Sequence, residues 1–424
     1  MFNKSRLILL LLTAGWLLPA PLQAQGGGHS HGAQVRCPDR SCSPEDLLLD
    51  RLELSGLPAA IEALDSLAAV DSEVRRLGHN YAHALGLAAF TTPDEVGEVF
   101  SQCTEIFQSG CYHGVIQSYF ENYSSVHGDH LEAGALDALC ADQRSDPSQQ
   151  WLLFQCVHGL GHGLMMVYGN HLPSSLEGCD LLSAPWEREV CYGAVFMENV
   201  VLVTTPQDAF GRPEEASGSA ETMAVADEHA GHAMAMADRP EFPGIDRDRP
   251  LYPCTDLPDR YAQACYQMQT SAILHFNGRD IAETGRVCMT APEVFRSTCI
   301  QSLGRDVSAL TVQDNSKALR MCGAVPDGYE AFCHLGYAKN LVDQTADPQD
   351  GFEFCALLTA PESKRTCYTG IGEELWVLHT DITSRAQICQ GIEAAYVDAC
   401  LFGAGVRNER TAVSMALPAQ AWME

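Results

Sequence analysis

The sequence predicts an all-α solenoid of about nine helical-hairpin repeats, with one disulfide bridge in most of them. Two observations lead to this fold class: cysteine pairs recur at a nearly constant interval, and prolines recur between the members of a pair. In the C-terminal half the first cysteines of successive pairs are 33 or 34 residues apart. A period of this length with two helices per unit is typical of stacked helical repeats. The pairs are Cys254–Cys265, Cys288–Cys299, Cys322–Cys333, Cys355–Cys367 and Cys389–Cys400.

Each unit is predicted to contain a short helix that ends near the first cysteine and a longer helix that carries the second. Pro258, Pro292, Pro326 and Pro361 fall in the turns between them. Proline is tolerated in the first turn of a helix and ends the helix before it. The bridge therefore links the two helices of one hairpin, and in the entropic model each bridge stabilises the fold by roughly 2 to 4 kcal/mol.

The same pattern extends toward the N-terminus as Cys103–Cys111, Cys140–Cys156 and Cys179–Cys191, after one unit without cysteines. Cys37–Cys42 is the remaining pair, so the pairing uses all 18 cysteines. The position two residues after each second cysteine serves as a marker for the longer helix. The markers are His79, His113, His158, Gly193, Gln267, Gln301, Leu335, Thr369 and Phe402.

The N-terminus predicts export. Lys4 and Arg6 precede an apolar run from Leu7 to Leu18, which is typical of a signal peptide over residues 1–24. That run is shorter than the roughly 20 residues of a spanning helix, so no membrane span is expected in the mature chain. Paired cysteines indicate an oxidising compartment, hence a periplasmic or secreted protein. A formal charge of −29 repels phosphate backbones, so nucleic acid is not an expected partner.

Composition divides the mature chain into four segments. Residues 25–45 are predicted to be a flexible N-terminal segment, and 204–253 an acidic insertion loop that contains Pro, Met and His. The repeats occupy residues 46–203, which carry a group of histidines, and 254–424.

The histidines predict a metal site on the first three longer helices. His79 with His83, and His158 with His162, are separated by four residues, which places both imidazoles of a pair on one helix face. His113 occupies the corresponding marker position between them. Later units carry other residues at these positions, so the fold itself does not require histidine there. Neutral imidazole suits Zn, Cu or Fe, and the sequence does not choose among them.

Other residues are weaker candidates. Glu121 and Glu198 could serve as a catalytic base beside a bound ion. In the acidic loop, imidazole and thioether groups are mixed, a combination that suits copper. These weak metal candidates are His229, His232, Met234 and Met236.

Three hypotheses therefore remain open. In the first, the chain binds one or two transition-metal ions through the histidines and is possibly a metal-dependent enzyme. In the second, it is a scaffold that binds an exported protein or peptide in an accessible groove without catalysis. That groove is predicted to run along the marker positions and along the positions four residues after each marker. Its residues include Gln267, Gln301, Arg305, Lys339 and Glu373. In the third, the protein stores or delivers periplasmic copper through the acidic loop.

Overall fold

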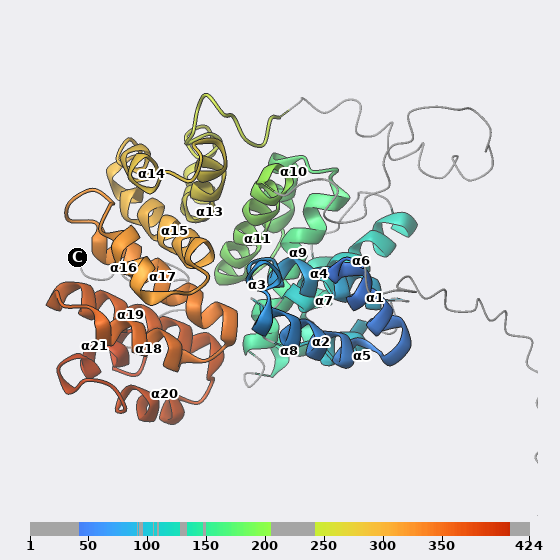
Figure 1. The fold of residues 1–424 in the computed structure, drawn as a ribbon. Coiled ribbons are helices and arrows are strands. Elements are labelled where there is room, and N and C mark those ends of the chain that lie inside the picture. Colours follow the sequence, from blue (N-terminus) through green and yellow to red (C-terminus); the bar gives the residue numbers. More distant parts are fainter. Residues whose placement is uncertain are drawn as a thin grey trace, which may run out of the picture. The chain divides into compact units, whose positions relative to one another are not determined.

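The computed structural model describes residues 42–90, 92, 96–104, 106–107, 110–127, 134–146, 150–204 and 242–407. Within these ranges the regular secondary structure is helical, and no strand occurs (Figure 1). Residue contacts separate residues 1–35 from the unit formed by 36–424, to which every described residue belongs.

The described residues of the N-terminal half form eleven helices, and after α3 each longer helix is separated from the next by one or two short ones. They are α1 (Pro44–Ser55), α2 (Leu57–Val70), α3 (Ser72–Arg76), α4 (Gly78–Ala89), α5 (Val96–Ser101), α6 (Gly110–His127), α7 (Ala135–Leu139), α8 (Ala141–Ser145), α9 (Gln150–Val167), α10 (Leu172–Cys179) and α11 (Pro185–Thr204).

The C-terminal half repeats a short helix followed by a long one. Its elements are α13 (Asp259–Phe276), α14 (Ile281–Cys288), α15 (Glu293–Thr311), α16 (Asn315–Cys322), α17 (Glu330–Thr345), α18 (Pro348–Leu357), α19 (Pro361–Leu378), α20 (Ile382–Cys389), the 3₁₀ turn η4 (Ala394–Tyr396) and α21 (Val397–Gly403).

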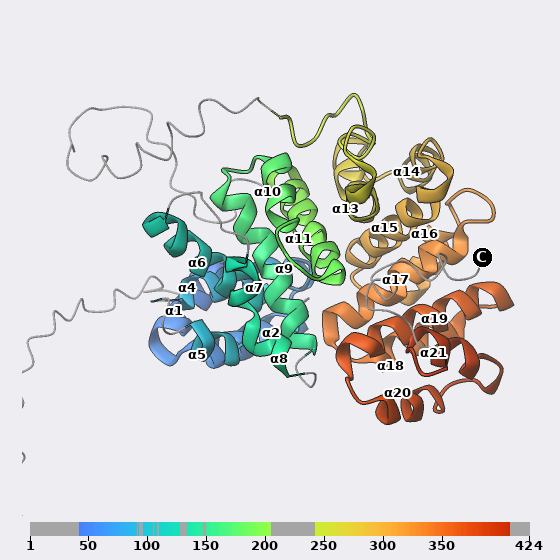
Figure 2. The same cartoon turned by 180° about the vertical axis from the view of Figure 1, so that it is seen from behind.

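The longer helices pack on one another in chain order. Helix α4 packs on α6, α6 on α9, and the series continues through α11, α13, α15, α17 and α19 to α21. The shorter helices cover the outside of this series, as Figure 2 shows for α14, α16 and α18 from behind. Each longer helix between α4 and α21 therefore has two long neighbours.

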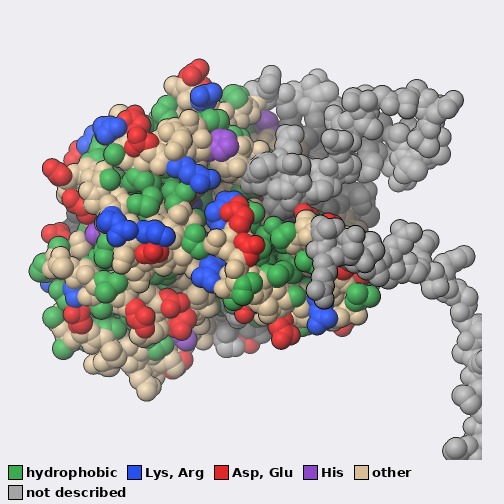
Figure 3. Space-filling model, viewed as in Figure 1, with side chains coloured by type: hydrophobic (Ala, Val, Ile, Leu, Met, Phe, Trp, Pro, Cys, Tyr) green, Lys and Arg blue, Asp and Glu red, His purple; other side chains and the backbone are tan. Residues whose placement is uncertain are grey.

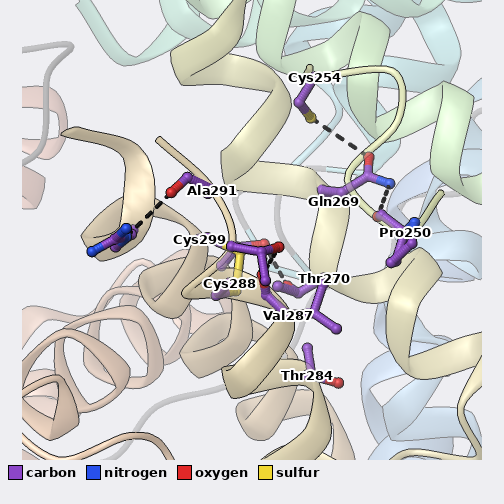
Figure 4. The surroundings of a disulfide bond; sticks show 12 residues. Pro250, Cys254, Gln269, Thr270, Thr284, Val287, Cys288, Ala291 and Cys299 are labelled. Atoms are coloured by element: carbon purple, nitrogen blue, oxygen red, sulfur yellow. Dashed lines mark hydrogen bonds between the residues drawn. A yellow bond between two sulfur atoms is a disulfide. The ribbon is translucent and has the colours of Figure 1, made fainter. Parts of the chain in front are cut away.

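Eight disulfide bridges join the cysteines that the spacing predicts as pairs. Figure 4 shows one of them, Cys288–Cys299, which links the end of α14 to α15. The predicted Cys37–Cys42 bridge includes Cys37, which lies outside the described residues, as does the predicted signal peptide. Each of the eight bridges connects positions at most 16 residues apart, so it fastens a hairpin rather than distant parts of the chain.

Aspartate begins four of the shorter helices. Asp280, Asp314, Asp347 and Asp381 each accept a hydrogen bond from a backbone N–H of the first turn, which satisfies one donor that a helix start leaves unpaired. Each lies eight residues before the first cysteine of its unit. His171 occupies the corresponding position before α10, and its Nδ1 accepts a hydrogen bond from the N–H of Ser174. His171 thus has a structural role.

Glycine allows α4 and α6 to approach at the histidines. A Cβ on Gly114 of α6 would lie 2.0 Å from the carbonyl oxygen of His83, and one on Gly86 of α4 would lie 2.1 Å from that of Cys111. No side chain fits at such distances. The absence of a side chain at these two positions therefore brings the imidazoles of both helices into one space.

Gly114→Ala is expected to push α4 away from α6. Because overpacking of this kind costs about 1 to 3 kcal/mol, the free energy of unfolding should fall by that amount. Urea unfolding measures the change, with Gly193→Ala as the control. A Cβ on Gly193 meets no atom within 4 Å. Equal losses in the two variants would contradict the close approach.

The N-terminal half of the helix series also contacts α17 and α19 of the C-terminal half. The N–H of Phe107, before α6, donates to the carbonyl oxygen of Gln344 in α17 at 3.0 Å. Trp186 of α11 and Trp376 of α19 meet edge to face with ring centroids 5.7 Å apart. The segment before α6 and helix α11 are therefore held against α17 and α19 by a hydrogen bond and by aromatic packing.

The last part of the predicted insertion loop is folded. Residues 242–253 are described, Leu251 and Tyr252 are buried, and the side-chain amide of Asn199 donates to the carbonyl oxygen of Gly244. Residues 205–241 lie outside the described residues. Among the described helices, none combines the length and apolar character that crossing a bilayer requires.

Candidate metal centre

Five imidazole rings from three neighbouring helices form one cluster. His79 and His83 lie on α4, His113 on α6, and His158 and His162 on α9. The ring centroids of His79 and His113 are 5.3 Å apart, those of His113 and His158 4.4 Å, and those of His83 and His162 5.8 Å. Helices α4 and α9 both pack on α6, and their histidines meet beside His113.

Three of these histidines form the core of the cluster, the His triad His113, His158 and His162. One ring nitrogen from each lies within 4.8 Å of the others. Their side chains are buried, with exposed fractions of 3, 6 and 2 per cent. Three nitrogens at this separation could converge on one ion with small side-chain movements, because metal–imidazole bonds are about 2.0 to 2.1 Å long.

Hydrogen bonds at the outer edge of the cluster orient the rings. The Nδ1–H of His162 donates to a carboxylate oxygen of Glu198 at 3.0 Å. His113 Nε2 lies 3.1 Å from the side-chain oxygen of buried Gln155, and His79 Nδ1 lies 3.0 Å from the carbonyl oxygen of Phe107. Because each of these oxygens only accepts, the nitrogen facing it carries the proton. The other nitrogen then presents a lone pair.

Four ring nitrogens of the cluster are buried without a hydrogen-bond partner among the described residues. They are His83 Nε2, His113 Nδ1, His158 Nε2 and His162 Nε2. Buried polar atoms are nearly always paired, so four such atoms in one cluster require an explanation. Two of them, on His113 and His162, are the nitrogens opposite the oriented N–H groups. Ligating histidines in metal sites show this arrangement of one donated N–H and one free lone pair.

Burial keeps the imidazoles of His83, His113 and His158 neutral. Loss of solvation, followed by repulsion from His162, lowers the pKa of His83 to about 3. Burial also lowers the pKa of His113 and of His158 well below the usual value, and repulsion from neighbouring imidazoles adds to it. Neutral imidazole is the form that coordinates a metal ion, so at neutral pH these rings need no deprotonation before binding.

The same pKa shifts predict that the metal-free protein loses stability in acid. In the unfolded chain each histidine takes up a proton near pH 6.5, whereas folded His83 stays neutral to about pH 3. The unfolded state then binds more protons, and the loss from His83 is about 2 kcal/mol at pH 5. Urea unfolding with chelator at pH 7.5 and pH 5 measures it. His83→Asn should show a smaller acid loss than the wild type, and an equal loss would contradict the assignment.

The structure places Glu198 behind the ring of His162, on the side away from the free nitrogens. In this position the carboxylate of Glu198 can orient the ring of His162, but it does not face a reactant from which it could accept a proton. Glu121 lies on α6, but its side chain is outside the described residues. The weak candidates His229, His232, Met234 and Met236 are also outside them.

Glu198→Gln is expected to weaken metal binding by about 10- to 100-fold, because partners that orient ligating histidines usually contribute that much. Competition with a chromophoric chelator measures the affinity. Glu177→Gln on α10 is the matched control, since this glutamate is exposed. An affinity of the Glu198 variant equal to that of the control would remove Glu198 from the site.

The predicted accessible groove is wrong at the histidine end. His113 and His158 are buried there and His79 is partly buried, because α4, α6 and α9 close around them. Further along, Gln301 and Glu373 are also buried, with exposed fractions of 9 and 4 per cent. What remains open is a cavity of about 250 Å³. Its wall contains His158 and the predicted groove residues Gln267, Gln301, Arg305, Lys339 and Glu373.

Sequence reasoning missed the groups that orient the rings. Gln155 directly precedes a paired cysteine, and a glutamine in an apolar helical stretch is the one signal that could have identified it. Phe107 contributes a backbone oxygen at a positive φ of 55°. A backbone contact of this kind depends on how the segment before α6 folds, and the side chains carry no pattern for it.

Comparison with known proteins gives no relative. No family model, no curated protein and no solved structure matches this chain. The functional argument therefore depends on the geometry of the cluster.

Proposed function

We propose that this chain is an exported protein that binds one or two transition-metal ions, Zn, Cu or Fe, through His79, His83, His113, His158 and His162. The observation that carries the proposal is the set of buried, unpartnered ring nitrogens directed into one cluster, with opposite nitrogens held by acceptors. An ion would satisfy these nitrogens at once. Structural packing alone gives no reason to bury four unpaired nitrogens together.

The scaffold is proposed to be a solenoid of about nine αα-hairpin repeats with a period of about 34 residues. The markers of the sequence support it, since each lies on one of the successive longer helices from α4 to α21. In this scheme the first three repeats hold the ion and the later repeats hold the wall of the adjoining cavity. Periplasmic or secreted localisation is proposed from the N-terminal signal pattern and from the disulfide bridges.

The cavity gives the metal centre a possible catalytic role. His158 belongs both to the His triad and to the cavity wall, so a molecule in the cavity would lie beside the ion. An ion with a coordination position open toward the cavity would activate water or polarise a bound group. At about 250 Å³ the cavity suits a small molecule rather than a folded protein, which favours this role over a protein-binding scaffold.

Metal analysis of the purified, untagged mature protein tests the proposal. After reconstitution with Zn, Cu or Fe and removal of excess metal, one or two ions per chain should remain. Deletion of residues 221–240 should leave this number unchanged. A wild-type protein without bound metal would contradict the proposal, and loss of the ion on deleting the loop would favour copper storage there.

A further inference from the structure

The cavity beside the His triad has more acidic than basic groups on its wall. Four carboxylates line it, contributed by α11, α17 and α19, against the two cations Arg305 and Lys339. The carboxylates are Glu189, Asp343, Glu373 and Glu374. A small, partly buried cavity of this kind attracts cations, because little water is present to screen the negative charges on its wall.

Both cations are already neutralised by partners in the protein. The ammonium of Lys339 lies 3.2 Å from Glu373 and 2.9 Å from Glu374. The guanidinium of Arg305 lies 2.8 Å from Asp306 and also donates to the carbonyl oxygen of Gln267 at 2.9 Å. Glu189 and Asp343 bring the wall to four carboxyl groups against two cations, and these two residues form its acidic side.

The carboxyl groups of the acidic side are poorly solvated. Burial, followed by repulsion from Glu374, raises the pKa of Asp343 well above its usual value. Burial also raises the pKa of Glu189 to about 7. Arg188 opposes the shift at Glu189, and Lys339 and Arg305 oppose it at Asp343, but burial outweighs them. An ammonium group bound beside these carboxyl groups would favour their ionised form.

A second, independent observation points to a ligand. Gln301 on α15 lines the cavity, its side chain is 9 per cent exposed, and its side-chain oxygen has no hydrogen-bond partner among the described residues. A buried amide oxygen in this position costs free energy unless a donor reaches it. A cationic N–H group would satisfy both the oxygen and the acidic wall.

The other walls fit an organic cation better than a metal ion. Phe154 stacks on the ring of His158 with centroids 5.7 Å apart, and Trp186 and Met268 also line the cavity. Aromatic faces and thioethers accommodate an alkyl chain and attract an ammonium group. Among the described residues, the cavity carboxylates do not form a group spaced to hold a metal ion.

We propose that this cavity binds a small alkylammonium ion, so that a primary amine is the substrate class of the adjacent metal centre. The ammonium group lies against the acidic side and Gln301, and the alkyl chain lies along the wall formed by Phe154 and Trp186, toward His158. This inference rests on the proposed metal-binding function for the identity of the neighbouring group. The binding of the amine itself is a separate property of the cavity.

The test compares n-butylamine with n-butanol and butyrate, which have similar size but different charge. Isothermal titration of the metal-loaded, full-length protein at pH 7 should show n-butylamine binding at least about tenfold more tightly than n-butanol, and butyrate not binding. Gln301→Leu should weaken amine binding by about tenfold, with unchanged metal content and thermal unfolding. Gln387→Leu, in a separate cavity, is the matched control and should bind like the wild type.

Proximity to the metal is tested by nuclear relaxation. The methylene protons of bound n-butylamine should relax several times faster with Cu(II)-loaded protein than with Zn-loaded protein. Equal affinity for n-butylamine and n-butanol, an unchanged affinity in Gln301→Leu, or no paramagnetic effect would each overturn the inference. A protein that retains no metal would instead contradict the proposed function, and the amine and alcohol titrations would still decide the cation site.

Discussion

Replacing His158 and His162 together by alanine is expected to abolish tight metal binding while the protein remains folded. Two of the three nitrogens of the His triad disappear in this variant. The free energy of binding zinc at structural sites with about four ligands is roughly 10 to 16 kcal/mol, so each ligand contributes about 3 kcal/mol to it. Loss of two should raise the dissociation constant by roughly 10⁴-fold. Equilibrium dialysis with elemental analysis measures this change, and far-ultraviolet circular dichroism reports the helical content.

The matched control is His334→Ala with His379→Ala, which removes two histidines on or beside other helices. His334 lies on α17 near Phe354, and His379 follows α19. This variant should retain the wild-type metal content. Equal loss of metal in both double variants would show that the histidine cluster is not the site, as would retention of metal in the His158 and His162 variant.

Complete reduction of the disulfides is expected to unfold the protein. In the entropic model eight bridges contribute roughly 2 to 4 kcal/mol each. Their sum exceeds the 5 to 15 kcal/mol of net stability that is usual for folded proteins. Thermal melts before and after reduction under denaturing conditions measure the effect. A reduced protein with an unchanged melting temperature would contradict the role of the bridges.

Single bridges should separate stability from metal binding. Cys288→Ser with Cys299→Ser removes a bridge far along the chain from the histidines, and should lower stability by about 2 to 4 kcal/mol without changing metal content. Cys140→Ser with Cys156→Ser removes the bridge that fastens α9 two residues before His158. This second variant should also bind metal less tightly, since α9 is then less well held.

The hairpins could be predicted because their signals are local. A bridge that spans 11 residues, as from Cys288 to Cys299, leaves few ways to arrange the two helices it joins. Pro292 directly precedes α15 as predicted. The aspartates at the starts of the shorter helices carried a further signal, since Asp280 and Asp314 occupy equivalent positions and accept the expected hydrogen bonds.

The environment of the histidines could not be predicted in the same way. Their spacing indicated that they share a face, but their burial depends on how closely α4, α6 and α9 approach. Close contacts at Gly114 and Gly86 fix that approach. The presence of a glycine in the sequence does not indicate which neighbouring helix will pack against it. Figure 3 shows acidic and basic side chains mixed on the face it presents, so surface charge gives no indication of the buried cluster either.

X-ray absorption spectroscopy of the metal-loaded protein tests the central claim most directly, because it identifies the atoms bound to the ion. The structure predicts at least three imidazole ligands at about 2.0 to 2.1 Å, with no sulfur neighbour. A spectrum dominated by thioether sulfur, or one without imidazole scattering, would contradict metal binding by the histidine cluster.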